Sequence, residues 1–410
     1  MGEANWDVVV IGAGPGGGSA ALHCARLGLR TLVLEDHAEI GTPVHCGECL
    51  SEVAVQNLDL DLPEEVISLH VKGIRVLFPN EVEKKLTEPG YVLEKHLFER
   101  WLIDESVKEG AVFKHSHKVK GLNKKFKLEN QFSNWEILGE GELFPITTKM
   151  VIDASGVAGV SSKLLQNSNQ IEVIAGFQYE MIEVENDGYL DFYIWPKYAP
   201  HGYVWMIPKN EGRANVGLVT TEKKGAIKFL DSFISDTYLQ NNEKINPPWR
   251  MEGKKIKPFG GTIPISGPRN NTIDDGLIMI GDAAGFTSPL FEGGSHLAMK
   301  SGKYAAEVAK KSIENGKYSK TDLKVYEKLW KSEFPPYHKI LKGKTALYNL
   351  SDEELAIMAS CMPNEMSGMS IFTKIGVGLK ILIKKPSLMK KKAISVLLSF
   401  GYSRAKYYGW

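Results

Sequence analysis

The sequence has few cysteines, almost no net charge and no long apolar run. Four cysteines in 410 residues are too few for a fold held by disulfides, and they fit a reducing compartment. A net charge of +1 gives no general reason to expect nucleic-acid binding. No apolar run reaches the roughly 18 residues that a membrane-spanning helix needs. Because a strand pattern begins at Trp6, we expect no signal peptide and a cytoplasmic location.

The beginning of the chain has a pattern that is typical of dinucleotide binding. Residues 7–35, DVVVIGAGPGGGSAALHCARLGLRTLVLE, predict a strand, a glycine turn, a helix and a second strand. Gly12, Gly14 and Gly17 occupy the G-x-G-x-x-G positions, which allow a tight turn, close approach of a pyrophosphate and close packing of the helix. Glu35 follows about 20 residues later, where a carboxylate accepts hydrogen bonds from a ribose 2′-OH.

A second strand, turn and helix come late in the chain. Residues 276–280, GLIMI, predict a buried strand, and a Gly-rich loop and a long helix follow it. The Asp282 carboxylate could hold ribityl or ribose hydroxyls, and the backbone of Gly293 and Gly294 could face a ring or a phosphate. Together with the strand MVIDA at 150–154, these units predict a nucleotide-binding domain assembled from separate parts of the sequence.

Between these units the pattern changes to strands rich in aromatic residues. Four strand-like segments between 171 and 219 predict an antiparallel sheet, the helix that follows is expected at 225–241, and Pro258–Pro268 is expected to be a linker. The predicted fold is α/β, with a discontinuous Rossmann-like domain, an antiparallel-sheet substrate domain and a helical, basic C-terminal region. The expected boundaries are 1–70, 90–165 and 270–318 for the first, 71–89 and 166–269 for the second, and 319–410 for the third.

A loop after Glu35 carries two cysteines in the order Cys46-Gly47-Glu-Cys49. They could be a redox pair, half of a metal site or inert buried thiols. Zinc would need further ligands at a suitable spacing, and the sequence offers none, so we expect no metal.

Several short motifs together resemble the flavoprotein hydroxylase superfamily, which binds FAD. These are GAGPGG, VIDASG and GDAAG around a central antiparallel sheet. Within that superfamily, PVHCGE at 43–48 resembles the P-x-x-C-G element of the geranylgeranyl reductase family. YVWMIP at 203–208 is similar to the family's Y-x-W-x-F-P motif, with Ile207 in place of Phe. The resemblance covers about residues 1 to 310, while residues after 310 share only a helical character. It implies a Rossmann-like FAD-binding domain and an archaeal type of enzyme that saturates digeranylgeranylglycerophospholipids.

The resemblance also implies roles for individual residues. The reaction expected is reduction of C=C bonds in polyprenyl chains of a lipid. The residues implied to contact FAD are Gly12, Gly14, Pro15, Gly17, Glu35, Cys46, Gly47, Cys49, Arg100, Val119 (through its backbone to the adenine), Asp282, Gly294 and Ser295.

Cys46 is the predicted proton donor. An isolated alkene has no carbonyl to polarise, so addition of a hydride to one carbon requires a proton at the other. A thiol with its usual pKa of about 8.5 is neutral at pH 7 and can donate that proton.

Tyr203 and Trp205 alternate with apolar residues, so on a strand they share one side. They could form the wall of a lipid pocket, or be ordinary core residues.

The last 45 residues, 366–410, contain no Asp or Glu but nine Lys and Arg, which leaves a net charge of −8 on the rest of the chain. The lysines alternate with apolar residues, a composition that favours an anionic membrane surface. We therefore expect peripheral association with the cytoplasmic face of a membrane.

The electron donor and the class of reaction each have alternatives. The electron donor could be a reduced ferredoxin-like carrier or NAD(P)H. The sequence has no second G-x-G-x-x-G that would indicate a nicotinamide site. The alternatives to a reductase are a flavin-dependent monooxygenase or halogenase, whose W-x-W-x-I-P motif the 203–208 segment also resembles, and an electron-relay flavoprotein dehydrogenase.

Overall fold

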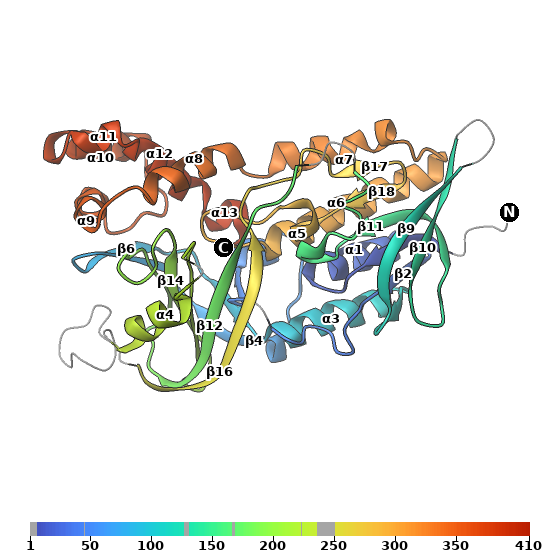
Figure 1. Ribbon diagram of the computed structural model, residues 1–410, viewed down its shortest axis with the longest axis horizontal. Coiled ribbons are helices and arrows are strands. Elements are labelled where there is room, and N and C mark those ends of the chain that lie inside the picture. The colour runs from blue at the N-terminus through green and yellow to red at the C-terminus, as the bar shows by residue number, and fades with distance from the viewer. Residues whose placement is uncertain (1–5, 45, 127–130, 166–168, 223, 236–250) are drawn as a thin grey trace.

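The computed structural model describes residues 6–44, 46–126, 131–165, 169–222, 224–235 and 251–410 (Figure 1). A mainly parallel sheet holds the beginning of the chain, with the strand order β17-β18-β11-β1-β2-β8 and the β9–β10 hairpin beside β11. Val8, Val9 and Val10 of β1 have no exposed surface, because both faces of a parallel sheet are covered. The strands are β1 (Trp6–Ile11), β2 (Thr31–Leu34), β8 (Val112–Lys114), β9 (Lys118–Phe126), β10 (Phe132–Glu140), β11 (Ile146–Asp153), β17 (Ile273–Asp274) and β18 (Leu277–Met279).

Helices from distant parts of the chain pack against this sheet. The first helix α1 lies between α3 and α6, and the backbones of α1 and α6 approach closely at Gly302. A Cβ at Gly302 would lie 2.6 Å from the carbonyl oxygen of Gly16, so the two helices require glycine there. The helices of this part are α1 (Pro15–Arg26), α3 (Lys95–Lys108), α5 (Gly281–Ala284), α6 (Ser295–Asn315) and α7 (Lys320–Glu333).

The second main sheet has seven strands in the order β16-β12-β15-β14-β13-β5-β6. Its pairs are antiparallel except β13 with β5. The long pair of β12 and β16 lies at one edge of the sheet (Figure 1). The members are β5 (Gly73–Phe78), β6 (Val82–Leu86), β12 (Val173–Val184), β13 (Tyr189–Tyr193), β14 (Tyr203–Pro208), β15 (Ala214–Val219) and β16 (Met251–Pro264), with α4 (Ala226–Ile234) packed against it.

The expected linker at Pro258–Pro268 is wrong, because most of it belongs to β16 and pairs with β12. The Gly and Pro content that indicated a linker is tolerated because β16 is an edge strand, where Pro need not donate to a neighbour. The helix expected at 225–241 is found as α4, and its predicted part beyond residue 235 lies outside the described residues.

A small sheet and short helices complete the molecule. Strands β3 (Cys49–Ser51), β7 (Gly90–Leu93) and β4 (Ile67–Val71) pair in that order, and α2 (Glu52–Asn57) follows β3. Lys95 begins α3. The C-terminal region is helical as predicted and comprises α8 (Tyr337–Leu347), α9 (Asp352–Ser360), α10 (Ile371–Lys384), α11 (Ser387–Lys390), α12 (Ala393–Tyr402) and α13 (Ala405–Tyr408). Within the described residues, no helix combines the length and hydropathy needed to span a bilayer.

Candidate functional site

A cavity of about 310 Å³ lies between the two main sheets. One wall follows the carboxyl ends of three neighbouring parallel strands, with Gly14–Gly16 after β1, Ala154 after β11 and Ile280–Asp282 after β18. In open α/β sheets, nucleotide ligands bind at this edge. The opposite wall comes from β12, β14 and β16 of the seven-stranded sheet.

The glycine turn has the form that a pyrophosphate requires. Gly12 has φ +100°, and a Cβ there would lie 2.4 Å from the carbonyl oxygen of Ala154. A Cβ at Gly17 would lie 1.9 Å from the carbonyl oxygen of Gly12, so the turn cannot close around a larger residue. At Gly14 no described atom lies within 4 Å of such a Cβ, and the next residue, Pro15, begins α1. The turn therefore leaves an open approach to the positive end of a helix.

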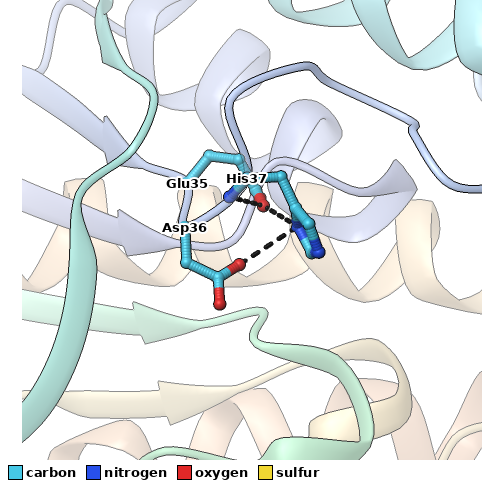
Figure 2. A group of neighbouring side chains, drawn as sticks. All are labelled: Glu35, Asp36 and His37. Atoms are coloured by element: carbon cyan, nitrogen blue, oxygen red, sulfur yellow. Dashed lines mark hydrogen bonds and ion pairs between the residues drawn. The ribbon is translucent and has the colours of Figure 1, made fainter.

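Glu35 lies at the carboxyl end of β2, beside the glycine turn. Its Oε2 accepts a hydrogen bond from the Ala13 N–H at 2.8 Å, and its Oε1 accepts one from the His37 N–H at 3.0 Å. Figure 2 shows that the His37 ring also contacts the carboxylates of Glu35 and Asp36, with Nδ1–oxygen distances of 2.6 Å and 3.1 Å. This group could offer three ligand atoms to a metal, but Asp36 and His37 are exposed and the three side chains interact with one another.

The predicted adenine contact lies close to Glu35. The segment before Val119 is joined to it by hydrogen bonds from the His117 N–H to the Glu35 carbonyl, 2.8 Å, and from the Glu35 N–H to the Lys114 carbonyl, 2.9 Å. Val119 itself is buried on β9. Arg100 is exposed on α3 and is not among the described residues that line the cavity, so its role in FAD binding stays a prediction.

The late strand and helix supply the second anchor. Asp282, Gly294 and Ser295 all line the cavity, with Ser295 beginning α6. The Thr287 hydroxyl donates a hydrogen bond of 2.5 Å to Asp282 Oδ1. Burial raises the pKa of Asp282, and the Thr287 hydroxyl opposes that shift.

The cysteine loop forms part of the cavity wall through Cys46, Gly47 and Cys49. Both cysteines are free thiols. The Glu48 N–H donates to Cys46 Sγ at 3.2 Å, and Cys49 Sγ donates to the Gly47 carbonyl at 3.4 Å. Desolvation raises the pKa of both thiols, so each is protonated at neutral pH. Lys95, near Cys46, opposes the shift of its thiol.

A buried polar network holds this loop to the seven-stranded sheet. Glu48 has φ 70°, and its Oε2 accepts hydrogen bonds from Lys209 Nζ and Asn215 Nδ2, both at 2.7 Å. Its Oε1 accepts the Lys95 N–H at 3.0 Å, at the start of α3. Lys209 also bonds Glu94 at 3.0 Å. The network fixes the loop from both sides, and Glu48, Lys95 and Lys209 were not predicted as site residues.

Tyr203 and Trp205 lie on the cavity side of β14, while Val204 and Met206 pack into a separate apolar cluster with α4. The Trp205 Nε1–H donates to Gln178 Oε1 at 3.1 Å, and Gln178 Nε2 donates to the Cys46 carbonyl at 3.2 Å. Gln178, on β12, therefore links the aromatic wall to the cysteine loop.

Further aromatic and polar residues of the cavity were not predicted. Phe192 and Phe291 contact the Tyr203 ring, with centroid distances of 5.6 Å and 5.5 Å. Trp410 and Glu292 also line the space. These residues come from three separate parts of the chain, and the one sequence feature that marks any of them is the Gly-rich loop that contains Phe291 and Glu292.

Comparison with known proteins agrees with this geometry. Residues 7–164 match the family model of FAD dependent oxidoreductases, and residues 172–247 match the geranylgeranyl reductase catalytic domain. The digeranylgeranylglycerophospholipid reductase of Methanocaldococcus jannaschii is 36% identical over 403 residues, covering 94% of this chain and 97% of that protein. The Methanopyrus kandleri reductase 2 of the same name is 32% identical, covering 94% of this chain and 98% of that protein.

Solved structures give the same result. A geranylgeranyl bacteriochlorophyll reductase-like protein of Thermoplasma acidophilum has a TM-score of 0.81 and 31% identity, covering 96% of this chain and 100% of that one. A flavin-dependent brominase, with a TM-score of 0.68 and 19% identity, covers 95% of this chain and 93% of that one, and shares the fold.

The fold and the glycine-rich cavity define an FAD-dependent oxidoreductase. More narrowly, the chain belongs to the digeranylgeranylglycerophospholipid reductase family. Since 94% of the chain aligns with its relatives, the expectation that the resemblance stops near residue 310 is wrong. The residues present fit FAD, because two Gly-rich turns and the start of α1 face one cavity and leave the backbone accessible.

Proposed function

We propose that the protein reduces C=C bonds in the geranylgeranyl chains of a membrane lipid, with FAD as its cofactor. The observation that carries the proposal is a single cavity that joins the Gly-rich cofactor cradle to a thiol and an aromatic wall. Reduced FAD supplies a hydride when it is bound. The apolar walls accept a polyprenyl chain and exclude water from the reacting carbons.

The aromatic wall supports a lipid substrate. Tyr203, Phe192 and Phe291 contact one another edge-on or tilted and leave ring surface toward the cavity. A second, smaller apolar cavity of about 50 Å³ adjoins the first and shares Phe192, Phe291 and Trp410 with it. A long flexible chain can occupy both spaces in series, which a compact polar substrate would not require.

Cys46 is the proposed proton donor. Its thiol stays protonated because desolvation raises its pKa, and it faces the same cavity as Asp282 and Gly294 of the cofactor cradle. Gln178 donates a hydrogen bond to the Cys46 carbonyl and the Glu48 N–H donates one to its Sγ, so both the loop and the thiol are held at the cavity wall. General acids of this kind contribute about 10²–10⁴-fold to the rate.

The decisive experiment is anaerobic. The FAD-loaded protein is reduced with dithionite, mixed with geranylgeranyl lipid in detergent, and the products are weighed by mass spectrometry. We expect gains of two hydrogens per reduced bond with oxidation of the flavin. No mass gain, with the flavin still reduced, would refute the proposal. Because dithionite replaces the electron donor, the result does not depend on whether a ferredoxin-like carrier or NAD(P)H reduces FAD in the cell.

Cys46→Ala tests the proton donor in the same assay. We expect it to keep FAD and to lose at least about 100-fold in alkene reduction, because the proton must come from a less well-placed source. Cys361→Ala is the control, since Cys361 is buried at the end of α9 and does not line the cavity. Unchanged turnover of Cys46→Ala removes this thiol from the mechanism.

The proposal includes docking on an anionic membrane surface through α10. This helix leaves six large apolar side chains exposed, among them Phe372 at 82% and Ile383 at 80%. Lys374, Lys380 and Lys384 lie on the same helix, and Val377 and Ile381 bury its other side. An amphipathic helix with this arrangement suits insertion at the level of lipid head groups.

Vesicle sedimentation tests the docking. Each cation near an anionic surface contributes about 1 kcal/mol, so changing the three lysines to Gln should weaken binding to anionic vesicles roughly 100-fold. Phe372→Ser should weaken it through lost apolar contact, and Lys331→Gln on α7 is the control. Equal binding of all four proteins to anionic vesicles would exclude α10 as the docking element.

A further inference from the structure

Glu292 is a buried carboxyl group inside the cavity. Its side chain is 4% exposed, and neither carboxylate oxygen makes a hydrogen bond to a described residue. The nearest cation is Lys344 of α8, with Nζ 3.5 Å from Oε1, and this ammonium group also has no hydrogen-bond partner among the described residues. An ion pair this poorly bonded costs stability, so its presence at the cavity indicates a function.

Other titratable groups surround Glu292. Tyr203 of β14 and Tyr348, at the end of α8, face it, and Lys344 is the cationic neighbour. Tyr203 is in turn within electrostatic range of Cys49, and Cys49 of Cys46. Glu292, Tyr203, Cys49 and Cys46 all line the same cavity, so four proton-carrying side chains share the space that contains the predicted donor.

We propose that Glu292 is the proton reservoir of the site and that Tyr203 and Cys49 carry its proton to Cys46 after each hydrogenation. The inference rests on the proposed function. Each alkene gains one hydride, and the S–H bond of Cys46 breaks to give the other carbon a proton. The thiolate then takes a proton from Cys49, Cys49 from the Tyr203 hydroxyl, and Tyr203 from the Glu292 carboxyl. Glu292 recovers its proton from solvent past Lys344.

The direction of this transfer is favourable. Burial raises the pKa of Glu292 to about 7, against the opposing charge of Lys344. Desolvation raises the pKa of the Cys46 thiol, so the Cys46 thiolate is a stronger base than the Glu292 carboxylate. Glu292 is thus about half protonated near pH 7 and gives its proton to the thiolate. A lipid with several double bonds needs such a supply, since Cys46 holds one proton.

Glu292→Gln separates the first turnover from the later ones. The reduced, FAD-loaded variant starts with Cys46 protonated, so we expect the first oxidation of flavin by lipid to stay within about 3-fold of wild type. With excess dithionite, the later turnovers should slow at least about 10-fold. The wild-type rate of these later turnovers should fall as pH rises through about 7, and the variant should lack that dependence. Glu353→Gln, at a side chain 72% exposed, is the control.

The outcomes are distinct. If Glu292→Gln slows the first and later turnovers equally, or slows neither, Glu292 is not the proton reservoir. Tyr203→Phe keeps the ring and removes the hydroxyl, so it should slow the later turnovers relative to its own first turnover, and it carries the test if Glu292→Gln does not retain FAD. A wild-type protein that never transfers hydrogen to the lipid refutes the proposed function instead, which the first turnover alone reveals.

Discussion

Replacing Lys209 with Met should lower the free energy of unfolding, because Lys209 joins the cysteine loop to the start of α3. Its Nζ bonds Glu48 at 2.7 Å and Glu94 at 3.0 Å, and the side chains of Lys209 and Glu48 are each 4% exposed. Removing one partner of a buried ion pair costs about 3–5 kcal/mol, because the remaining charge is buried without compensation. Here Asn215 still bonds Glu48 and Arg213 still bonds Glu94, so we expect the lower end, about 3 kcal/mol.

The assay is urea-induced unfolding of the FAD-loaded protein, followed by circular dichroism and flavin fluorescence. Lys385→Met is the matched control, since Lys385 also bonds a glutamate, Glu353, at 2.7 Å, but the two side chains are 27% and 72% exposed. An exposed pair contributes about 0–1 kcal/mol, so the control should unfold almost like wild type. The Lys209–Glu48 and Lys385–Glu353 pairs have the same nitrogen–oxygen distance of 2.7 Å, so burial and the second carboxylate, Glu94, distinguish Lys209 from the control.

A double-mutant cycle with Glu48→Gln tests the physical reason. The Gln amide has one oxygen, so it keeps one of the two hydrogen bonds from Asn215 and from the Lys95 N–H, and no charge remains at position 48 for Lys209 to balance. The double variant should therefore be more stable than the sum of the single effects by at least about 1.5 kcal/mol. Effects that add to within about 0.5 kcal/mol would refute the interpretation that these two charges compensate each other.

Three further predictions concern the cofactor turn and pH. Gly17→Ala should weaken FAD binding at least about 10-fold by equilibrium dialysis, since its Cβ would lie 1.9 Å from the Gly12 carbonyl oxygen, while Gly121→Ala, with open space, should not. Burial lowers the pKa of His296 to about 4, so stability present above about pH 6.5 should fall toward pH 4, and His296→Gln should flatten that loss of Tm. Burial raises the pKa of Glu94, but the hydrogen bond from Arg213 outweighs burial and lowers the pKa to about 2. The ionised Glu94 therefore stabilises the fold above about pH 4.5, and this stability is lost as the pH falls toward 2. In Glu94→Gln, Tm should change less between pH 4.5 and 2 than in wild type.

The cofactor cradle could be predicted from sequence because its parts are local. A strand, a turn with glycines at fixed spacing and a helix are specified by neighbouring residues, and the same holds for Asp282 and Gly294 before α6. The alternation of Tyr203 and Trp205 with Val204 and Met206 also predicted a shared face, since side chains of a strand alternate.

The edge strand β16 was missed because its local composition contradicts its structure. Pro258 pairs opposite Tyr179, and Gly260 and Gly261 lie opposite Phe177 and Gly176. Such a segment is a strand only because β12 is available beside it and its other edge needs no donor. Sequence patterns describe neighbours in the chain, and here the stabilising partner lies some 80 residues away.

The polar residues of the site were missed for a related reason, which is that their chemistry depends on burial by distant segments. Glu48 and Lys209 are 161 positions apart, and each alone has the appearance of a solvated charge.

Trp410 likewise constrains residues that are distant in the sequence, in this case two glycines. A Cβ at Gly90 would lie 2.4 Å from the Trp410 ring, and one at Gly293 would lie 2.1 Å from its carbonyl oxygen. Trp410 therefore restricts two glycines, 320 and 117 positions earlier, one through its ring and the other through its backbone, and it lines both cavities. Glu292, next to Gly293, pairs with Lys344 of α8, so the surroundings that make it a candidate proton reservoir come from a helix about 50 residues later in the chain.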